Sequence, residues 1–191
     1  AKMSDITAKS NAKSSLTVSQ IAVIGVMTAA TCVLAPLSLP IGPVPISLTN
    51  LVIYFSLYTL GTMKGTISYL VYLLLGLVGL PVFSSFTSGP GKLFGPTGGY
   101  LIGFIPMAII AGLVIDPYIN KRIVCLLGMI AGTAVCYLFG TAWLAYQANM
   151  GFQAALMAGV IPFIVGDLIK MVLAMLIGPQ IRSQLKRANL Y

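Results

Sequence analysis

Residues 97–115 read TGGYLIGFIPMAIIAGLVI and contain no charged side chain. A helix needs about 20 mainly apolar residues to cross the hydrocarbon core of a bilayer, and this run is of that length. The rest of the chain is similar, since 58% of its 191 residues are hydrophobic and 7% are charged. A soluble domain carries about 25% charged residues. The composition therefore predicts an all-α integral membrane protein and excludes a water-soluble fold.

The same criterion finds six candidate spans in the chain. They are residues 16–36, 47–62, 65–80, 97–115, 122–145 and 160–178. We find no internal repeat or second domain in the sequence, so we expect a single bundle of six transmembrane helices. Residues 147–159 are ambiguous, because they fit either a loop with a short surface helix or an early start of the last span. Pro162 suits the first turn of a helix and favours the loop.

The basic residues are distributed unequally between the two sides of the predicted bundle. If both chain ends are cytoplasmic, Lys92 lies on the outer side and Lys170 within a span, and the other nine of the 11 Lys and Arg residues lie in the cytoplasm. Positively charged loops stay in the cytoplasm, so this pattern predicts an N-in, C-in orientation in the cell membrane. Residues 1–15 are then a polar cytoplasmic tail, 16–180 the six-helix transmembrane domain and 181–191 a basic cytoplasmic tail. The nine cations are Lys2, Lys9, Lys13, Lys64, Lys121, Arg122, Arg182, Lys186 and Arg187.

Several classes of function are disfavoured by what the sequence lacks. It has no histidine, which removes His-dependent hydrolases and the commonest metal ligand. It has no GxxxxGKS or GxxxxGKT segment, and so no recognisable means of hydrolysing ATP. Its net charge of +8 comes from cations at the edges of apolar segments, which fits an anionic membrane surface rather than nucleic acid. We therefore expect neither an enzyme nor a metal or cofactor site.

Two ionisable side chains, Asp167 and Lys170, lie within a predicted span. Charges at membrane depth are expensive and usually functional. At a spacing of i and i+3 the two share one face of a helix. A carboxylate beside an ammonium suits a small ligand that both donates and accepts hydrogen bonds. The alternative is a neutralising ion pair that only holds helices together.

The long predicted outer loop, residues 79–100, combines aromatic side chains with hydroxyls and glycines. Its aromatic residues are Phe83, Phe86, Phe94 and Tyr100. Glycine lets backbone groups approach a ligand closely, and aromatic walls with a few polar groups are typical of small-molecule pockets. An ordinary re-entrant connector is the alternative. Lys92 is the only charge in this loop, and it either attracts an anionic ligand or lies in solvent.

The outer end of the second span carries three polar side chains, Ser47, Thr49 and Asn50. Polar residues at such a position either cap the helix or face a ligand. The sequence favours neither interpretation.

Four short sequence motifs occur in a fixed order along the chain. They are PVPISLTN at 43–50, GLPVF at 79–83, GPTGGYLIGF at 95–104 and IPFIVGDLIK at 161–170. Together they resemble the BioY family, the biotin-binding substrate-specificity (S) components of energy-coupling factor (ECF) transporters. The resemblance implies that residues 16–180 form a substrate-binding domain that captures biotin with high affinity from outside. It also implies a transmembrane coupling protein and two ATP-binding-cassette ATPases as partners.

The resemblance further implies which residues form the sites. Asp167 accepts from the ureido N–H groups of biotin, while Lys170 donates to the ureido carbonyl or pairs with the ligand's carboxylate. The residues that match the family's motifs are supplemented by residues of the outer loop and of the start of the second span. The full set of candidate ligand-binding residues is Asp167, Lys170, Asn50, Tyr100, Gly98, Gly99, Thr49, Ser88, Lys92 and Phe86. The family's small-residue coupling surface on the first span is matched loosely by Ala22, Gly25, Ala29 and Ala30.

Three other functions are compatible with parts of the sequence. An S component for another small vitamin differs from a biotin-specific one in a few side chains, and a ligand panel separates the two. An intramembrane enzyme requires detectable turnover of a peptide or lipid. A channel or purely structural protein predicts no saturable ligand binding.

Overall fold

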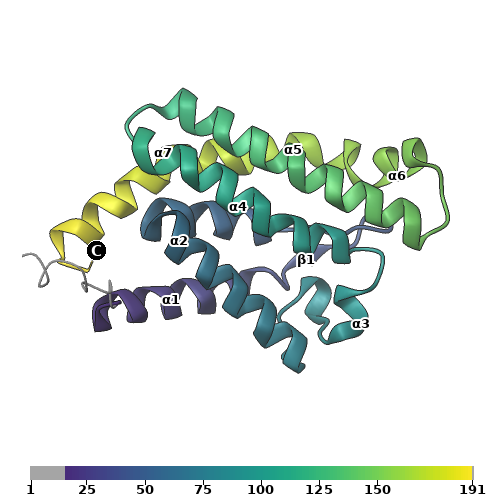
Figure 1. Ribbon diagram of the computed structural model, residues 1–191, viewed down its shortest axis with the longest axis horizontal. Helices are drawn as coiled ribbons and strands as arrows, with labels where there is room; N and C mark the ends of the chain where they lie inside the picture. The colour runs from purple at the N-terminus through teal and green to yellow at the C-terminus, as the bar shows by residue number, and fades with distance from the viewer. Residues whose placement is uncertain (1–15, 191) are drawn as a thin grey trace, which may run out of the picture.

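Helices account for most of the computed structural model, which describes residues 16–190 (Figure 1). The long ones are α1 (Val18–Leu34), α2 (Thr49–Val78), α4 (Gly98–Tyr118), α5 (Arg122–Gln147) and α7 (Ile164–Arg187). The shorter elements that connect them are β1 (Ser38–Leu39), β2 (Ile46–Ser47), η1 (Ser84–Phe86), α3 (Pro90–Leu93), α6 (Phe152–Gly159) and η2 (Ile161–Phe163). The predicted all-α architecture is therefore confirmed, with the addition of one small strand pair.

The helix α2 consists of two arms that reverse direction at Gly61. This residue has φ +81° and ψ 177°, a conformation that glycine almost alone adopts. A Cβ atom built on Gly65 lies 3.1 Å from the carbonyl oxygen of Ser56, whereas a straight helix separates these residues by about 13 Å. The arms therefore run antiparallel. The predicted break between the spans 47–62 and 65–80 is confirmed.

The described residues thus contain six apolar helical segments: α1, the two arms of α2, α4, α5 and α7. Four helical stretches are long and apolar enough to cross a membrane by length and composition, namely Thr49–Val78, Gly98–Tyr118, Arg122–Gln147 and Phe152–Arg187. The apolar helix α1 is shorter, at 17 residues. Val18, Val78 and Ile123 are more than 70% exposed, which suits contact with lipid.

The segment before the last long helix is a loop with a short helix, as Pro162 suggested. α6 ends at Gly159, and Pro162 lies in the single turn η2 that leads into α7. The short helix α6 lies beside the C-terminal end of α5 (Figure 1). It brings the carbonyl of Gly159 to the site described below.

The helices α4 and α5 pack with their backbones in close contact. A Cβ atom on Gly132 would lie 2.7 Å from the carbonyl oxygen of Met107, and one on Gly103 would lie 3.1 Å from that of Cys136. Small residues at such positions allow transmembrane helices to approach without side chains between them. The pair forms a rigid support for the residues that α4 and α5 present to the interior.

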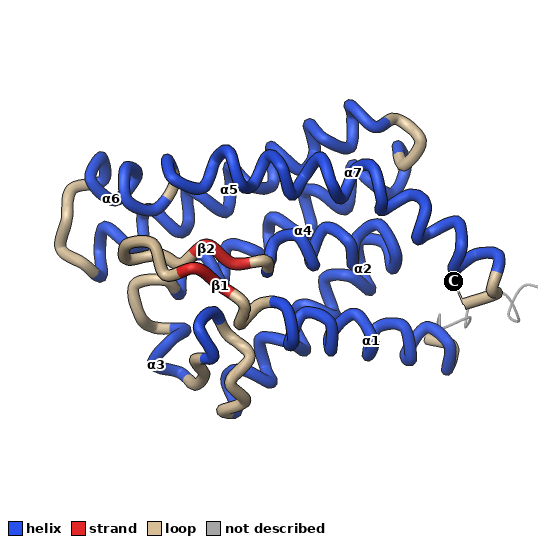
Figure 2. The backbone as a smooth tube through the Cα atoms, turned by 180° about the vertical axis from the view of Figure 1, so that it is seen from behind, coloured by secondary structure: helices blue, strands red, loops and turns tan. Residues whose placement is uncertain are grey.

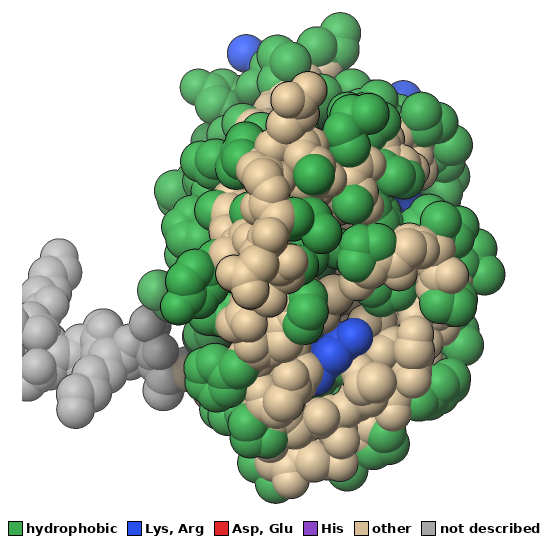
Figure 3. Space-filling model, turned by 90° about the vertical axis from the view of Figure 1, so that its right-hand side faces the viewer, with side chains coloured by type: hydrophobic (Ala, Val, Ile, Leu, Met, Phe, Trp, Pro, Cys, Tyr) green, Lys and Arg blue, Asp and Glu red, His purple; other side chains and the backbone are tan. Residues whose placement is uncertain are grey.

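The two ends of the bundle differ in the elements they carry. The start of α1 and the end of α7 lie at one end (left in Figure 1), while β1, α3 and α6 lie towards the other. The strands β1 and β2 pair antiparallel, with Ser38 opposite Ser47 and Leu39 opposite Ile46, and are seen between α3 and α6 in Figure 2. Figure 3 shows that this second end, here called the connector end, exposes hydrophobic side chains around its margin, and backbone, uncharged side chains and one Lys or Arg side chain in its central part.

At the opposite end of the bundle, the Asp116 carboxylate makes hydrogen bonds and an ion pair that join several helices. The Asp116 carboxylate accepts hydrogen bonds from the backbone N–H of Thr62 at 2.8 Å and from its hydroxyl at 2.6 Å. It also pairs with the Arg182 guanidinium of α7 at 3.3 Å. Asp116 thereby caps the arm of α2 that begins after Gly61, from a neighbouring helix. One carboxylate joins α2, α4 and α7.

Candidate ligand-binding site

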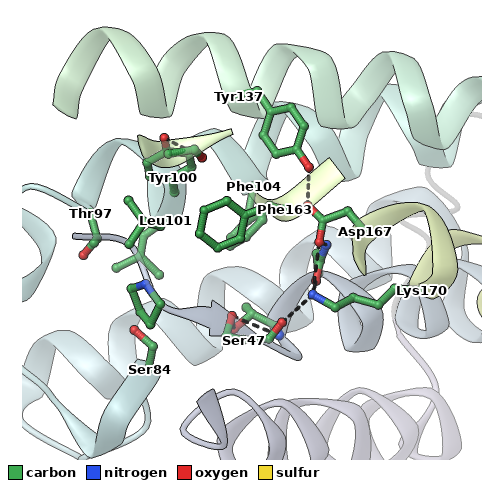
Figure 4. A pocket seen from close by; sticks show the side chains of 15 residues that line it. Ser47, Ser84, Thr97, Tyr100, Leu101, Phe104, Tyr137, Phe163, Asp167 and Lys170 are labelled. Atoms are coloured by element: carbon green, nitrogen blue, oxygen red, sulfur yellow. Dashed lines mark hydrogen bonds and ion pairs between the residues drawn. The ribbon is translucent and has the colours of Figure 1, made fainter. Parts of the chain in front are cut away.

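A cavity of about 70 Å³ lies between the connectors and the helices at the connector end. The wall combines aromatic and aliphatic side chains with one compact group of polar residues (Figure 4). Its lining residues are Val44, Pro45, Ser47, Thr49, Asn50, Ser84, Thr97, Tyr100, Leu101, Phe104, Tyr137, Gly159, Phe163, Asp167 and Lys170.

The polar part of the wall is built from two helices. Asn50 comes from the first turn of α2, and Asp167 and Lys170 from the first two turns of α7. Lys170 Nζ lies 3.0 Å from Asp167 Oδ1 and 3.1 Å from Asn50 Oδ1, while Asn50 Nδ2 donates to Asp167 Oδ1 at 2.8 Å. All three residues are less than 9% exposed. The structure therefore brings the three main predicted polar residues together in one buried cluster.

Two further members of this cluster were not predicted. The hydroxyl of Tyr137, on α5, donates to Asp167 Oδ2, and the backbone carbonyl of Ser47, in β2, accepts from Lys170 Nζ at 2.7 Å (Figure 4). A tyrosine inside an apolar span needs a partner for its hydroxyl, and that was the available signal for Tyr137. A backbone carbonyl leaves no signal in the sequence.

The apolar part of the wall comes from α4, η2 and the loop before β2. Tyr100 and Phe104 lie on one face of α4, and Phe163 lies at the end of η2. The hydroxyl of Tyr100 donates to the carbonyl of Gly159 at 2.9 Å, so this side chain also ties α4 to the end of α6. Its ring lines the cavity, as the sequence predicted for an aromatic contact.

Thr49 lines the cavity but is tied to its neighbour. Its side chain is 2% exposed, and its hydroxyl lies 2.9 Å from that of Ser47. Thr49 thus helps to join β2 to the start of α2.

Gly98 and Gly99 do not line the cavity, although they were predicted as ligand contacts. A Cβ atom on Gly98 would lie 1.6 Å from the carbonyl oxygen of Leu93, and one on Gly99 would lie 2.3 Å from Cβ of Trp143. The structure therefore gives both glycines a packing role at the start of α4, which places the neighbouring Tyr100 at the cavity.

The predicted loop residues Ser88, Lys92 and Phe86 are also absent from the cavity wall. Phe86 is 64% exposed and borders a separate groove beside the β1–β2 hairpin. Lys92 lies in α3, where partial burial lowers the pKa of its ammonium below the ordinary value. In this structure these three residues are close in sequence to the site but do not form it.

The predicted partner-binding residues lie together on α1. Ala22, Gly25 and Ala29 are exposed, and Ala30 is half-buried. A Cβ atom on Gly25 would meet no other atom within 4 Å. The described part of the chain therefore leaves this small-residue face of α1 uncovered.

Comparison with known proteins identifies the family. The model of the BioY family matches residues 8–187 of the sequence. The chain belongs to the BioY family. It is 38% identical to the biotin transporter BioY of Thermotoga maritima, over 83% of this chain and 93% of that protein. It is 37% identical to the probable biotin transporter BioY of Pyrococcus horikoshii, over 86% of this chain and 96% of that protein.

A solved structure agrees with this BioY assignment. The fold matches the crystal structure of the S-component for biotin from an ECF-type ABC transporter with a TM-score of 0.76 and 32% sequence identity. The match covers 87% of this chain and 92% of that one. Membership of the BioY family makes the chain a multi-pass membrane protein that takes part in transport, rather than an enzyme. The resemblance seen in the sequence is confirmed.

Proposed function

We propose that this chain is the biotin-binding S component of an ECF-type importer, which captures biotin with high affinity from outside the cell. The observation that carries the proposal is the buried cluster of Asn50, Asp167, Lys170 and Tyr137 at the wall of the cavity. The biotin S-component that it resembles in fold, and relatives named biotin transporters, support the ligand. Biotin is the transported ligand, and we expect no cofactor.

The chemistry of the cavity suits biotin. A ureido ring presents two N–H donors and one carbonyl acceptor, and the polar cluster offers both acceptors and donors. The fused ring and aliphatic tail are apolar, and Phe104 and Phe163 supply apolar surface on the same cavity. Buried polar groups that are matched by the ligand give specificity, because a ligand that lacks them leaves the protein groups unpaired.

We further propose six crossings of the cell membrane with both chain ends in the cytoplasm. The start of α1 and the end of α7 at one end of the bundle support an even number of crossings (Figure 1). Of the predicted cytoplasmic cations, Lys64 follows the reversal at Gly61, Lys121 and Arg122 lie at the start of α5, and Arg182 lies in the last two turns of α7. None of them lines the cavity. Residues 1–15, the predicted cytoplasmic tail, lie outside the described residues.

The proposed partners are a transmembrane coupling protein and two ATP-binding-cassette ATPases. The 191-residue sequence contains no GxxxxGKS or GxxxxGKT segment, and we propose that these partners supply the energy for uptake against a gradient. The uncovered small-residue face of α1 supports a helix–helix contact, because small residues allow close approach within a membrane.

The direct test is equilibrium binding of biotin to the full chain in detergent, by calorimetry and by the fluorescence of Trp143. We expect saturable one-to-one binding in the nanomolar range, and weaker binding by an Asp167→Asn variant. Loss of one partner in a buried polar set costs about 2–5 kcal/mol. A folded wild-type chain that does not bind biotin, but binds another vitamin in a panel, would contradict the proposed ligand and retain the S-component assignment.

A further inference from the structure

The helix α1 is short for a transmembrane helix, and both of its ends are fixed. A capping box between Thr17 and Gln20 begins it, and Pro36 comes two residues after its last residue. Its 17 residues rise about 26 Å, whereas the hydrocarbon core of a bilayer is about 30 Å thick. The β1–β2 hairpin continues from this helix end (Figure 2). We therefore expect the residues just after α1 to lie at the edge of the hydrocarbon layer.

The groove beside the β1–β2 hairpin, here called the hairpin groove, lies at this end of α1. It measures about 660 Å³ and is much larger than the ligand cavity. None of the described residues that line it is charged, and serine is its only polar residue type. Its apolar lining includes Pro36, Leu37, Leu39, Ile46, Leu48 and Phe86. The hairpin groove is therefore suited to an apolar occupant.

The hairpin groove continues the lipid-facing surface of α1. Val26 and Val33 on α1 are exposed, and so is Leu37, which lies three residues beyond the helix and lines the groove. Exposed apolar surface of this kind marks contact with a membrane. Little water is available at this depth to fill a hollow, and an empty hollow loses the dispersion contacts of its lining. The acyl chains of the surrounding lipid are the occupants that this surface already meets.

The strand β2 separates the hairpin groove from the ligand cavity. Residues 44–45 line the cavity, whereas Ile46 and Leu48 line the groove. Ser47 lines both spaces, and its carbonyl accepts from Lys170 Nζ at 2.7 Å on the cavity side. Material that fills the groove therefore packs against the back of the cavity wall.

We propose that the hairpin groove binds an acyl chain of a membrane lipid, and that this chain supports β2 from the side opposite the ligand. The chain adds dispersion contacts to Ile46 and Leu48, which restricts the movement of the wall. Lysine 170 holds the same strand from the other side through the Ser47 carbonyl. The lipid site itself does not depend on the identity of the ligand, while its effect on biotin binding rests on the proposed function.

The test for the site is the quenching of an introduced tryptophan by a phospholipid with brominated acyl chains. Phe86→Trp places the indole in the groove, and Val33→Trp is the matched control, because it exposes an indole on α1 just before the groove. Brominated lipid is titrated into the full chain in detergent, and the signal of Trp143 in the wild type is subtracted. We expect Phe86→Trp to be half-quenched at about threefold less lipid than Val33→Trp, since a groove contacts a chain on more sides than a convex surface does. If Phe86→Trp does not fold, Leu39→Trp takes its place.

The test for the support of β2 is the affinity for biotin, measured by calorimetry on the delipidated wild type before and after unbrominated lipid is added. We expect the affinity to rise by about threefold or more, because a lipid that binds the ligand-competent form stabilises it. Stronger quenching in the groove with no change in biotin affinity overturns the support of β2 and retains the lipid site.

Equal quenching of the two tryptophans overturns the lipid site and leaves biotin capture intact. A tryptophan in the groove that lipid does not quench, in a preparation whose mass by light scattering is that of two chains, assigns the groove to a second copy and also overturns the proposal. A folded wild type that does not bind biotin contradicts the proposed function, and the quenching result then decides the lipid site by itself.

Discussion

Asp167 is a buried carboxylate in an apolar bundle, and its neighbours make that position possible. Removing a charge from water costs several kcal/mol unless partners compensate it. Lys170 supplies the opposite charge, and Asn50 and Tyr137 supply further donors. Asp167 also lies in the first turn of α7, where the helix dipole favours a negative charge. The Asp167 carboxylate, which lines the cavity, is therefore held in position without a ligand.

Tyr137→Phe tests how far this arrangement depends on the hydroxyl that the sequence did not reveal. The change removes the donor to Asp167 Oδ2 and keeps the ring that lines the cavity. A hydrogen bond to a charged group contributes about 1.5–3 kcal/mol, so we expect biotin affinity to fall by about tenfold or more. Calorimetric titration of the full chain measures the effect.

Tyr146→Phe is the control for this substitution, because Tyr146 lies on the same helix and is 75% exposed. It should bind biotin as the wild type does. Equal affinities for Tyr137→Phe and the control would show that Tyr137 acts in packing and does not orient the carboxylate.

At the residue scale, the sequence predicted the buried charged side chains of the cluster but not its uncharged tyrosine hydroxyl and backbone carbonyl. Asp167 and Lys170 were found because an intramembrane charge is unfavourable unless it is used. Tyr137 was missed because a tyrosine in an apolar run resembles ordinary core, and the Ser47 carbonyl because every residue has one. Gly98 and Gly99 have packing roles at the start of α4, which a glycine pair in a sequence does not distinguish from contact with a ligand.

At the scale of elements, the reversal at Gly61 sets the position of Asn50. The two arms of α2 pack antiparallel from this residue, and the Asp116 carboxylate caps the second arm. The first arm then carries Asn50 at its far end, beside α7. A backbone conformation at one end of the bundle thus determines the geometry of the site at the other.

Gly61→Ala should therefore destabilise the protein. A side chain at φ +81° and ψ 177° costs of order 1–3 kcal/mol in strain, so we expect a lower thermal unfolding midpoint in detergent. Gly25→Ala is the matched control, because a Cβ atom there meets nothing within 4 Å and its helix is regular. If both variants unfold at the wild-type temperature, the reversal tolerates a side chain and the account of α2 is wrong.

Hydropathy predicted the transmembrane helices, but it did not predict the segments that connect them. In the run of apolar residues from 47 to 80 the Lys64-Gly65 pair is the strongest sign of a turn, but the structure places the reversal at Gly61. The β1–β2 hairpin was not predicted, because two-residue strands are too short for an alternating pattern to show. Connectors carry much of the cavity wall, so the site was less predictable than the spans.

At the scale of the whole molecule, the cavity and the small-residue face of α1 occupy different parts of the bundle. The connector end holds the cavity, while the small-residue face runs along the outside of α1. Asn50, Asp167 and Lys170 belong to α2 and α7, so the polar wall of the cavity contains no residue of α1. Ligand capture and coupling to an energising module are therefore expected to be separable by mutation.

Enlarging the face of α1 tests this separation. Ala29→Leu combined with Gly25→Leu adds bulk to residues that are exposed and do not line the cavity. We expect biotin affinity of the isolated chain to be unchanged, because no lining residue is altered. Uptake of labelled biotin by cells that also express a coupling protein and its ATPases should fall by about tenfold or more, since added bulk at the centre of an interface weakens binding strongly.

Ala142→Leu, on an exposed position of α5, is the control and should transport normally. If the α1 variant retained uptake, the coupling contact would have to lie on another face of the bundle, and if it lost biotin binding as well, the two tasks would not be separable.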